Sequence, residues 1–169
     1  MKLHIGGESP KDGWKILNIQ PKDGVDFIGT ITDLSQFADE SIEEIYASHV
    51  LEHVLQRDVH KTLVGIQRIL NKGGRLYISV PDLEILCHIF LDPKAPKDVK
   101  THAMRMMFGG QMDDFDIHYM GWNQEFLFDE LQLAGFSEGK RVEVFGLFED
   151  TSNYRPYGIP ISLNVIAIK

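Results

Sequence analysis

The amino-acid sequence predicts a single α/β domain over 1–169, built on a doubly wound, mostly parallel sheet of about seven strands. Strand-like and helix-like segments alternate through the middle of the chain, which implies parallel strand pairing with helices between the strands. The last two predicted strands have no helix between them, so we expect that pair to be antiparallel. These observations define a fold class before any functional residue is considered.

Short apolar runs bounded by glycine, proline or polar residues indicate the strands. They are expected at 2–5, 14–19, 25–28, 43–47, 75–80, 141–148 and 162–168. Only about eight residues, Gly6 to Gly13, separate the first two strands. A parallel crossover with its helix needs at least about 10 to 12 residues. The first crossover helix is therefore expected to be short or absent.

Helical spacing of apolar residues and candidate capping residues indicate the helices. They are expected at 50–54, 58–72, 82–90 and 123–133, with Asp58, Asp82 and Asn123 as N-caps. Residues 91–122 combine prolines, glycines and methionines without a regular period. We expect this segment to form a lid or an insertion in the domain.

Composition excludes several classes of protein. The net charge of −8 argues against a nucleic-acid partner, which would need a basic surface. No apolar run approaches the length of a membrane span, and the N-terminal residues enter a strand at once, so neither a membrane segment nor a signal peptide is expected. The single cysteine, Cys87, lies in an apolar run and is predicted to be a buried thiol. A cytoplasmic location is the simplest interpretation.

The segment from Glu43 to Val54 is the most informative part of the chain, because a predicted strand ends there in a polar cluster. The cluster consists of Ser48, His49, Glu52 and His53. Ligands of open α/β sheets bind beyond the carboxyl ends of the strands, so these side chains are candidates for chemistry.

The same letters, His-x-x-Glu-His, also match a pattern of zinc peptidases. That interpretation needs a helix already formed at His49, where we expect the end of a strand. We therefore predict no metal ion, and a structural role for His53.

Four segments together resemble the class I S-adenosylmethionine-dependent methyltransferases over nearly the whole chain. They are 3–7, 48–53, 70–82 and 133–136. The resemblance implies a Rossmann-like seven-stranded sheet and S-adenosylmethionine as the cofactor. Carried over by position, it implies that the cofactor is held by Gly6, Gly7, Asn18, Asp33 and Ser48.

Two residues depart from the family's pattern. Glu8 follows the glycine turn and brings a negative charge near the expected methionine end of the cofactor. Asn18 stands where the family usually has an acidic residue that binds the ribose hydroxyls. Charge-assisted hydrogen bonds are roughly twice as strong as neutral ones. The amide of Asn18 therefore predicts weaker cofactor binding than an acidic residue would give, and Asn18→Asp is expected to tighten it.

The function expected from these residues is methyl transfer to a small-molecule or sugar-type acceptor. His49, and after it His118, are the candidate catalytic residues for proton removal, with helix capping as the alternative for His49. His118, Tyr119 and Trp122 are expected either to line the acceptor pocket or to pack under a loop. The alternative function is a methyltransferase-like binding or regulatory domain without turnover. A small-molecule acceptor is the expected partner, and the sequence is compatible with a homodimer.

Overall fold

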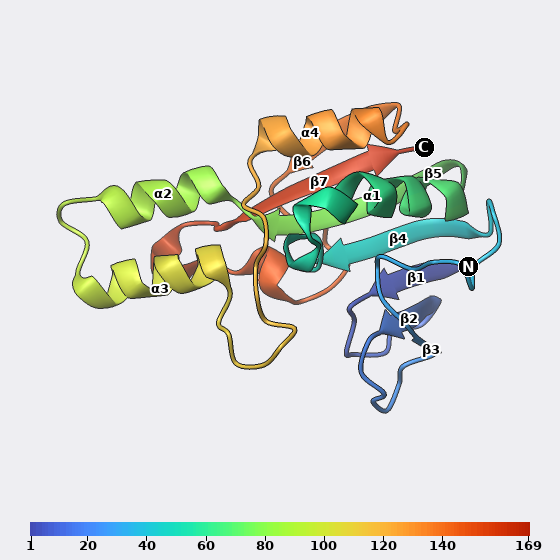
Figure 1. Cartoon of the computed structure of the whole chain (residues 1–169), viewed down its shortest axis with the longest axis horizontal. Helices are drawn as coiled ribbons and strands as arrows, with labels where there is room; N and C mark the ends of the chain where they lie inside the picture. Colours follow the sequence, from blue (N-terminus) through green and yellow to red (C-terminus); the bar gives the residue numbers. More distant parts are fainter.

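A computed structural model describes all residues, 1–169, and contains one seven-stranded sheet with the order β3-β2-β1-β4-β5-β7-β6 (Figure 1). The strands are β1 (Lys2–Ile5), β2 (Trp14–Asn18), β3 (Phe27–Ile28), β4 (Ile42–Ser48), β5 (Leu70–Pro81), β6 (Glu138–Val142) and β7 (Ser162–Ile168). Strands β1 to β5 pair in parallel, whereas β7 is antiparallel to both β5 and β6. The predicted fold class is confirmed, and the connection from β1 to β2 has no helix.

Four α-helices follow the fourth strand: α1 (Val59–Ile69), α2 (Leu83–Leu91), α3 (Lys97–Phe108) and α4 (Gln124–Leu133). Two of the predicted caps form: Asp82 accepts hydrogen bonds from the amides of Glu84 and Ile85, and Asn123 accepts one from the amide of Phe126. Asp58 makes no such bond, because a 3-10 turn (Gln56–Asp58) leads into α1 instead. None of the helices is long and apolar enough to cross a membrane.

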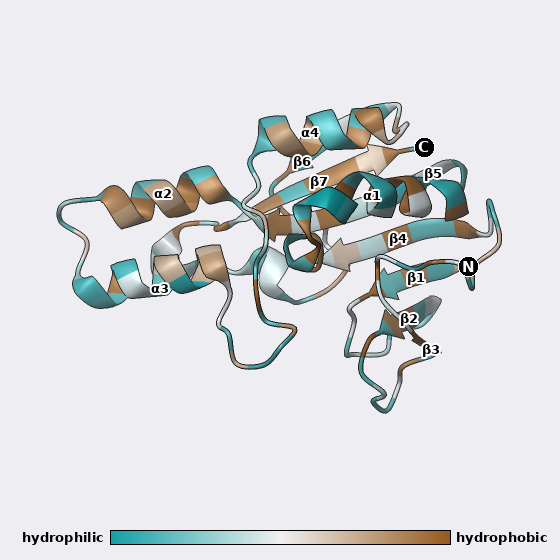
Figure 2. Ribbon diagram, in the orientation of Figure 1, coloured by the Kyte–Doolittle hydropathy of each residue, from teal (hydrophilic) through white to brown (hydrophobic).

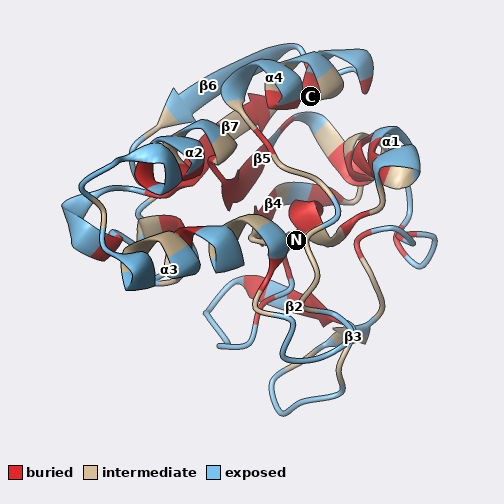
Figure 3. Ribbon diagram, turned by 60° about the vertical axis from the view of Figure 1, so that its left-hand side comes forward, coloured by how far each residue is buried: buried red, intermediate tan, exposed pale blue.

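The main core lies between one face of the sheet and helices α1 and α4, whose inner sides are buried (Figure 3). Hydrophobic and hydrophilic residues alternate along α1 and α4, as expected for helices with one buried side (Figure 2). The opposite face carries an aromatic cluster in which Phe148 packs on Tyr46 with ring centroids 4.6 Å apart. The predicted strand at 141–148 is wrong beyond Val142. The residues after it leave the sheet edge, because their aromatic side chains cover this face.

Helices α2 and α3 pack against each other beyond the carboxyl end of β5 (Figure 1). Leu86 and Ile89 of α2 are buried in this small second core, whereas Cys87 is exposed. The prediction of a buried thiol is therefore wrong. An apolar run on a helix buries only the side that has a partner, and α2 projects from the body of the domain.

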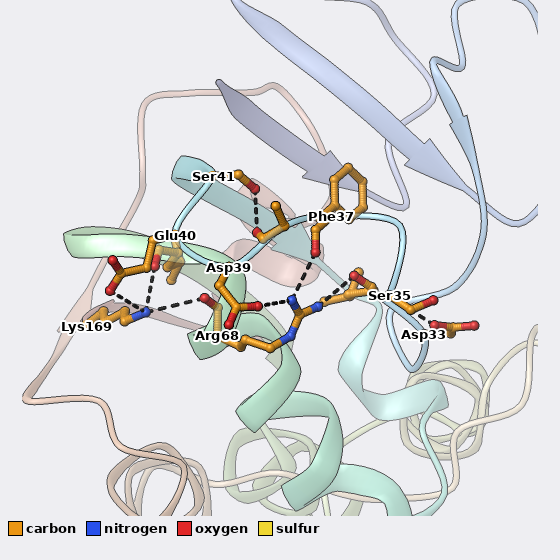
Figure 4. A network of polar contacts seen from close by, with 11 residues as sticks. Asp33, Ser35, Phe37, Asp39, Glu40, Ser41, Arg68 and Lys169 are labelled. Atoms are coloured by element: carbon orange, nitrogen blue, oxygen red, sulfur yellow. Dashed lines mark hydrogen bonds and ion pairs between the residues drawn. The ribbon is translucent and has the colours of Figure 1, made fainter.

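The connection between β3 and β4 is a series of turns that Arg68 of α1 holds in place (Figure 4). Its guanidinium donates hydrogen bonds to the carbonyls of Phe37 (3.0 Å) and Leu34 (2.8 Å) and to Asp39 Oδ1 (2.5 Å). The side chains of Leu34 and Phe37 enter the main core. One cation therefore satisfies carbonyls that a helix would have bonded internally.

Replacement of Arg68 by methionine is expected to lower the free energy of unfolding by about 2 kcal/mol, because two backbone carbonyls lose their donor. Arg57→Met is the matched control. Arg57 is exposed and has one ion pair, at 3.8 Å, so its loss should cost only a few tenths of a kcal/mol. Urea denaturation of both variants measures the difference, and equal effects would contradict this role for Arg68.

Candidate active site

A cleft of about 670 Å³ opens at the carboxyl ends of β1, β2 and β4. Its walls come from the turns that follow these strands, from residues 29–32 after β3, and from residues 113–116 and Tyr119 after α3. This is the edge of an open α/β sheet at which ligands bind. The volume is in the range of small-molecule and cofactor sites.

Gly6 and Gly7 serve different purposes in the turn after β1. Gly6 lines the cleft with φ of +77°, and a Cβ added there would lie 2.6 Å from Cγ2 of Val50. Gly7 is outside the lining of the cleft, and a Cβ there would lie 2.6 Å from Nδ1 of His4. Of the two predicted cofactor residues, Gly6 faces the cleft, and Gly7 packs toward the interior.

Asn18 lines the cleft at the end of β2, but its amide is committed to the protein. The residue is 8% exposed. Its Nδ2 donates to the carbonyl of Gly7, and its Oδ1 accepts from the amide of Gln20, both at 2.9 Å. Asn18 therefore ties the turn after β1 to the turn after β2.

Asn18→Asp is thus expected to weaken the site, contrary to the expectation from the sequence. A carboxylate has no proton for the carbonyl of Gly7 and would face it as a second acceptor, at a cost of about 1–3 kcal/mol in stability. Gln20→Glu adds the same charge to the same turn without breaking a side-chain hydrogen bond. Thermal unfolding and calorimetric titration with S-adenosylhomocysteine should show a loss for Asn18→Asp beyond that of the control. Tighter binding by Asn18→Asp would contradict this structural role.

The charge of Glu8 is paired. Glu8 lines the cleft, and its Oε1 lies 2.5 Å from Nζ of Lys22, which lines the same wall. The negative charge of Glu8, expected near the methionine end of a cofactor, is therefore offset by a cation from the turn after β2.

Two other predicted cofactor residues lie outside the lining of the cleft. Asp33 accepts a hydrogen bond from the amide of Ser35 at 3.1 Å, and hydrogen bonds from Ser35 hold the pKa of its carboxyl below the usual value. The threonines on either side of Ile31 line the cleft instead, with their hydroxyls 2.7 Å apart. The hydroxyl of Ser48 is buried without a hydrogen-bond partner.

A second cavity of about 360 Å³ adjoins the cleft, and both are lined by His49, His53 and Asp116. It is polar. Its other lining residues include Glu52, His102, Arg105, His118, Thr151 and Tyr154. Tyr119 lines the cleft, whereas Trp122 is fully buried in the core, as its packing alternative implied.

Both ring nitrogens of His49 are engaged. The hydroxyl of Ser162 donates to the carbonyl of Thr151 (3.0 Å), so it must accept from Nε2–H of His49 at 2.9 Å. Nδ1 lies 3.2 Å from Oε1 of Glu52. His49 has φ of +54° and precedes the 3-10 turn Leu51–His53, so the helix that the zinc-peptidase pattern requires is not formed at this residue.

His53 and His118 share a different arrangement. Nδ1–H of His53 donates to the carbonyl of Ile117 and Nδ1–H of His118 to that of Met106, both at 3.0 Å. Each neutral ring therefore keeps a lone pair on Nε2. Burial, the largest influence, lowers the pKa of His118, so the ring is neutral near pH 7. A neutral imidazole of this kind can accept a proton.

The carboxyl group of Glu52 lies at the base of the second cavity and is fully buried. Burial alone would raise its pKa. The contacts with His49, and a smaller electrostatic effect of His53, outweigh burial, and the pKa is lowered. The group is therefore a buried carboxylate within the polar cluster that the sequence places after β4.

Comparisons with known proteins agree with this architecture. A family model described as a methyltransferase domain matches residues 15–78, whereas comparison with curated proteins gives no match. A SAM-dependent methyltransferase of Thermotoga maritima has 20% sequence identity and a TM-score of 0.63, with 99% of this chain and 81% of that chain covered. A SAM-dependent methyltransferase of Archaeoglobus fulgidus has 16% identity and a TM-score of 0.60, with 99% and 85% covered.

The Burkholderia thailandensis 1,6-didemethyltoxoflavin-N1-methyltransferase, solved with 1,6-didemethyltoxoflavin and S-adenosylhomocysteine, has 14% identity and a TM-score of 0.62, with 99% and 70% covered. At these identities the solved structures establish the fold, and the matched model covers only residues 15–78. The chain therefore has the fold of the class I S-adenosylmethionine-dependent methyltransferases, and it matches the model of a methyltransferase domain over residues 15–78.

Proposed function

We propose that this protein transfers a methyl group from S-adenosylmethionine to a small-molecule or sugar-type acceptor. The observation that carries the proposal is the pair of adjoining cavities with His49, His53 and Asp116 in common. The larger cleft begins at the glycine turn and suits the nucleoside cofactor. The smaller polar cavity suits a hydroxyl- or amine-bearing acceptor.

S-adenosylmethionine is the cofactor that the family match and the fold indicate. The Burkholderia enzyme, with S-adenosylhomocysteine and its small substrate bound, supports the same pairing of donor and acceptor. Gly6 would allow backbone approach to the ligand, and Asn18 would keep the two turns in position. Gly7, Asp33 and Ser48 would act through the shape of the turns rather than by contact.

The chemistry is an in-line displacement. A lone pair of the acceptor oxygen or nitrogen forms a bond to the methyl carbon, and the electron pair of the breaking carbon–sulfur bond remains on sulfur. The products are the methylated acceptor and S-adenosylhomocysteine, and the acceptor's proton passes to a base. Nε2 of His118 is the better-placed base because both nitrogens of His49 are engaged. Alignment and exclusion of water supply most of the acceleration.

The test is calorimetric titration with S-adenosylmethionine and S-adenosylhomocysteine, followed by detection of S-adenosylhomocysteine with panels of sugar and amine acceptors. We expect binding, and turnover with one class of acceptor. Binding without turnover on any acceptor would favour the regulatory-domain alternative. No heat and no thermal shift at millimolar ligand would refute a cofactor site altogether, because a ligand of the native state must stabilise it.

A further inference from the structure

Glu52 has no hydrogen-bond donor for either carboxylate oxygen, although the residue is 0% exposed. A carboxylate buried in this way is costly unless a cation compensates it. Nδ1 of His49 is 3.2 Å away, but the one N–H of the neutral His49 ring is used by Ser162. In that tautomer a lone pair of Nδ1 faces the carboxylate, so the neutral His49 ring donates no hydrogen bond to Glu52.

Two further imidazole rings, those of His53 and His118, lie close to Glu52. The ring centroids of His53 and His118 are 4.8 Å apart. Each ring uses Nδ1 for its hydrogen bond to a carbonyl and leaves Nε2 without one to the protein. One donor atom from each of Glu52, His53 and His118 lies within 4.8 Å of the other two. Metal-bound histidines almost always donate their second ring N–H to a carboxylate, a backbone carbonyl or water. Both histidines already do so.

We propose that Glu52, His53 and His118 form a binding site for a divalent transition-metal ion of the zinc type. Two imidazoles and a carboxylate are a donor set typical of zinc, which keeps its fourth position open in catalytic sites, and of other first-row ions. Magnesium is disfavoured because it prefers oxygen ligands. The set differs from the peptidase pattern in the sequence, since His118 replaces His49 as the second histidine.

The open position of such an ion would point into the second cavity, which all three residues line. There the ion would bind an acceptor hydroxyl and lower its pKa, so that the oxygen is a better nucleophile. This role in acceptor binding rests on the proposed function, whereas the metal site itself does not. With an ion bound, proton release from the acceptor would no longer depend on Nε2 of His118.

The experiment is calorimetric titration of the chelator-treated, tag-free protein with Zn²⁺, together with the absorption spectrum of the Co²⁺ form. We expect one ion per chain, a rise in melting temperature with Zn²⁺, and visible Co²⁺ bands of low coordination number. His53→Gln and His118→Gln should each weaken Zn²⁺ binding by about tenfold or more. His60→Gln, which removes an exposed histidine of α1, is the matched control and should leave the affinity unchanged.

Absence of stoichiometric Zn²⁺ binding, or equal binding by the two cavity variants and the control, would overturn the metal site. If one cavity variant fails to fold, the Zn²⁺ affinity of the other variant tests the metal site. Titration with S-adenosylhomocysteine is independent of these outcomes. Cofactor binding without metal binding would leave the proposed function intact, and metal binding without cofactor binding would reject the proposed function and leave the site.

Discussion

Gly6→Ala is expected to lower the free energy of unfolding by about 3 kcal/mol and to weaken S-adenosylmethionine binding by more than about tenfold. A left-handed backbone costs a non-glycine residue roughly 1–2 kcal/mol, and an overpacked contact adds a similar amount. Here φ is +77° and the new methyl group would meet Val50 at 2.6 Å. Relief of this clash must move either the turn after β1 or the segment after β4, and both line the cleft.

Gly13→Ala is the control that separates the cost of a left-handed backbone from the cost of the steric clash with Val50. Gly13 has φ of +81°, but a Cβ there meets nothing within 4 Å. It should show the backbone cost alone, with unchanged cofactor affinity. Addition of Val50→Ala to Gly6→Ala should recover part of the lost stability. Urea denaturation and calorimetric titration measure both effects, and equal behaviour of the two glycine variants would contradict a special role for Gly6.

His4→Phe is expected to make the protein markedly less sensitive to acid. His4 lies on β1, facing the aromatic cluster of Tyr46 and Phe148, and its Nδ1 is buried without a partner. Burial lowers the pKa of His4 to about 4, against a smaller opposing effect of the charge of Asp150. The folded protein therefore holds this ring neutral at pH values at which the unfolded chain already binds a proton.

The direction in which stability changes with pH follows from this difference between the folded and unfolded pKa of His4. Between the unfolded pKa of 6.5 and the folded pKa of about 4 the unfolded state binds more protons, so stability falls as the pH falls through this window. The full loss is about 3 kcal/mol, since one pKa unit corresponds to about 1.4 kcal/mol. Phenylalanine removes the proton-binding group and keeps an aromatic ring in the cluster.

Urea denaturation of both proteins from about pH 7 to about pH 4.5 measures this effect. The stability of His4→Phe relative to the natural sequence should rise steadily as the pH falls, whatever the packing difference at neutral pH. A pH-independent difference between His4→Phe and the natural sequence would show that His4 is protonated equally in both states.

Local features of this chain could be predicted because they depend on neighbouring residues. Asp82 and Asn123 begin their helices as expected, since an N-cap needs only the next few amides. The short connection at Gly6 to Gly13 left room for a short crossover helix at most, by length alone. The predictions for Cys87 and for the strand end after Val142 were wrong, because exposure and pairing there depend on distant partners.

The sequence by itself determined the alternation of strands and helices, the reduced first crossover and the polar cluster after β4. Only the tertiary structure decided what that cluster does. It brings His118 from the segment after α3 against His53, and it leaves Glu52 without a donor. It also commits the amide of Asn18 to Gly7 and Gln20. The physical reason is that periodicity reports which side of an element is buried, whereas the partner of a buried polar atom depends on which distant segments meet there.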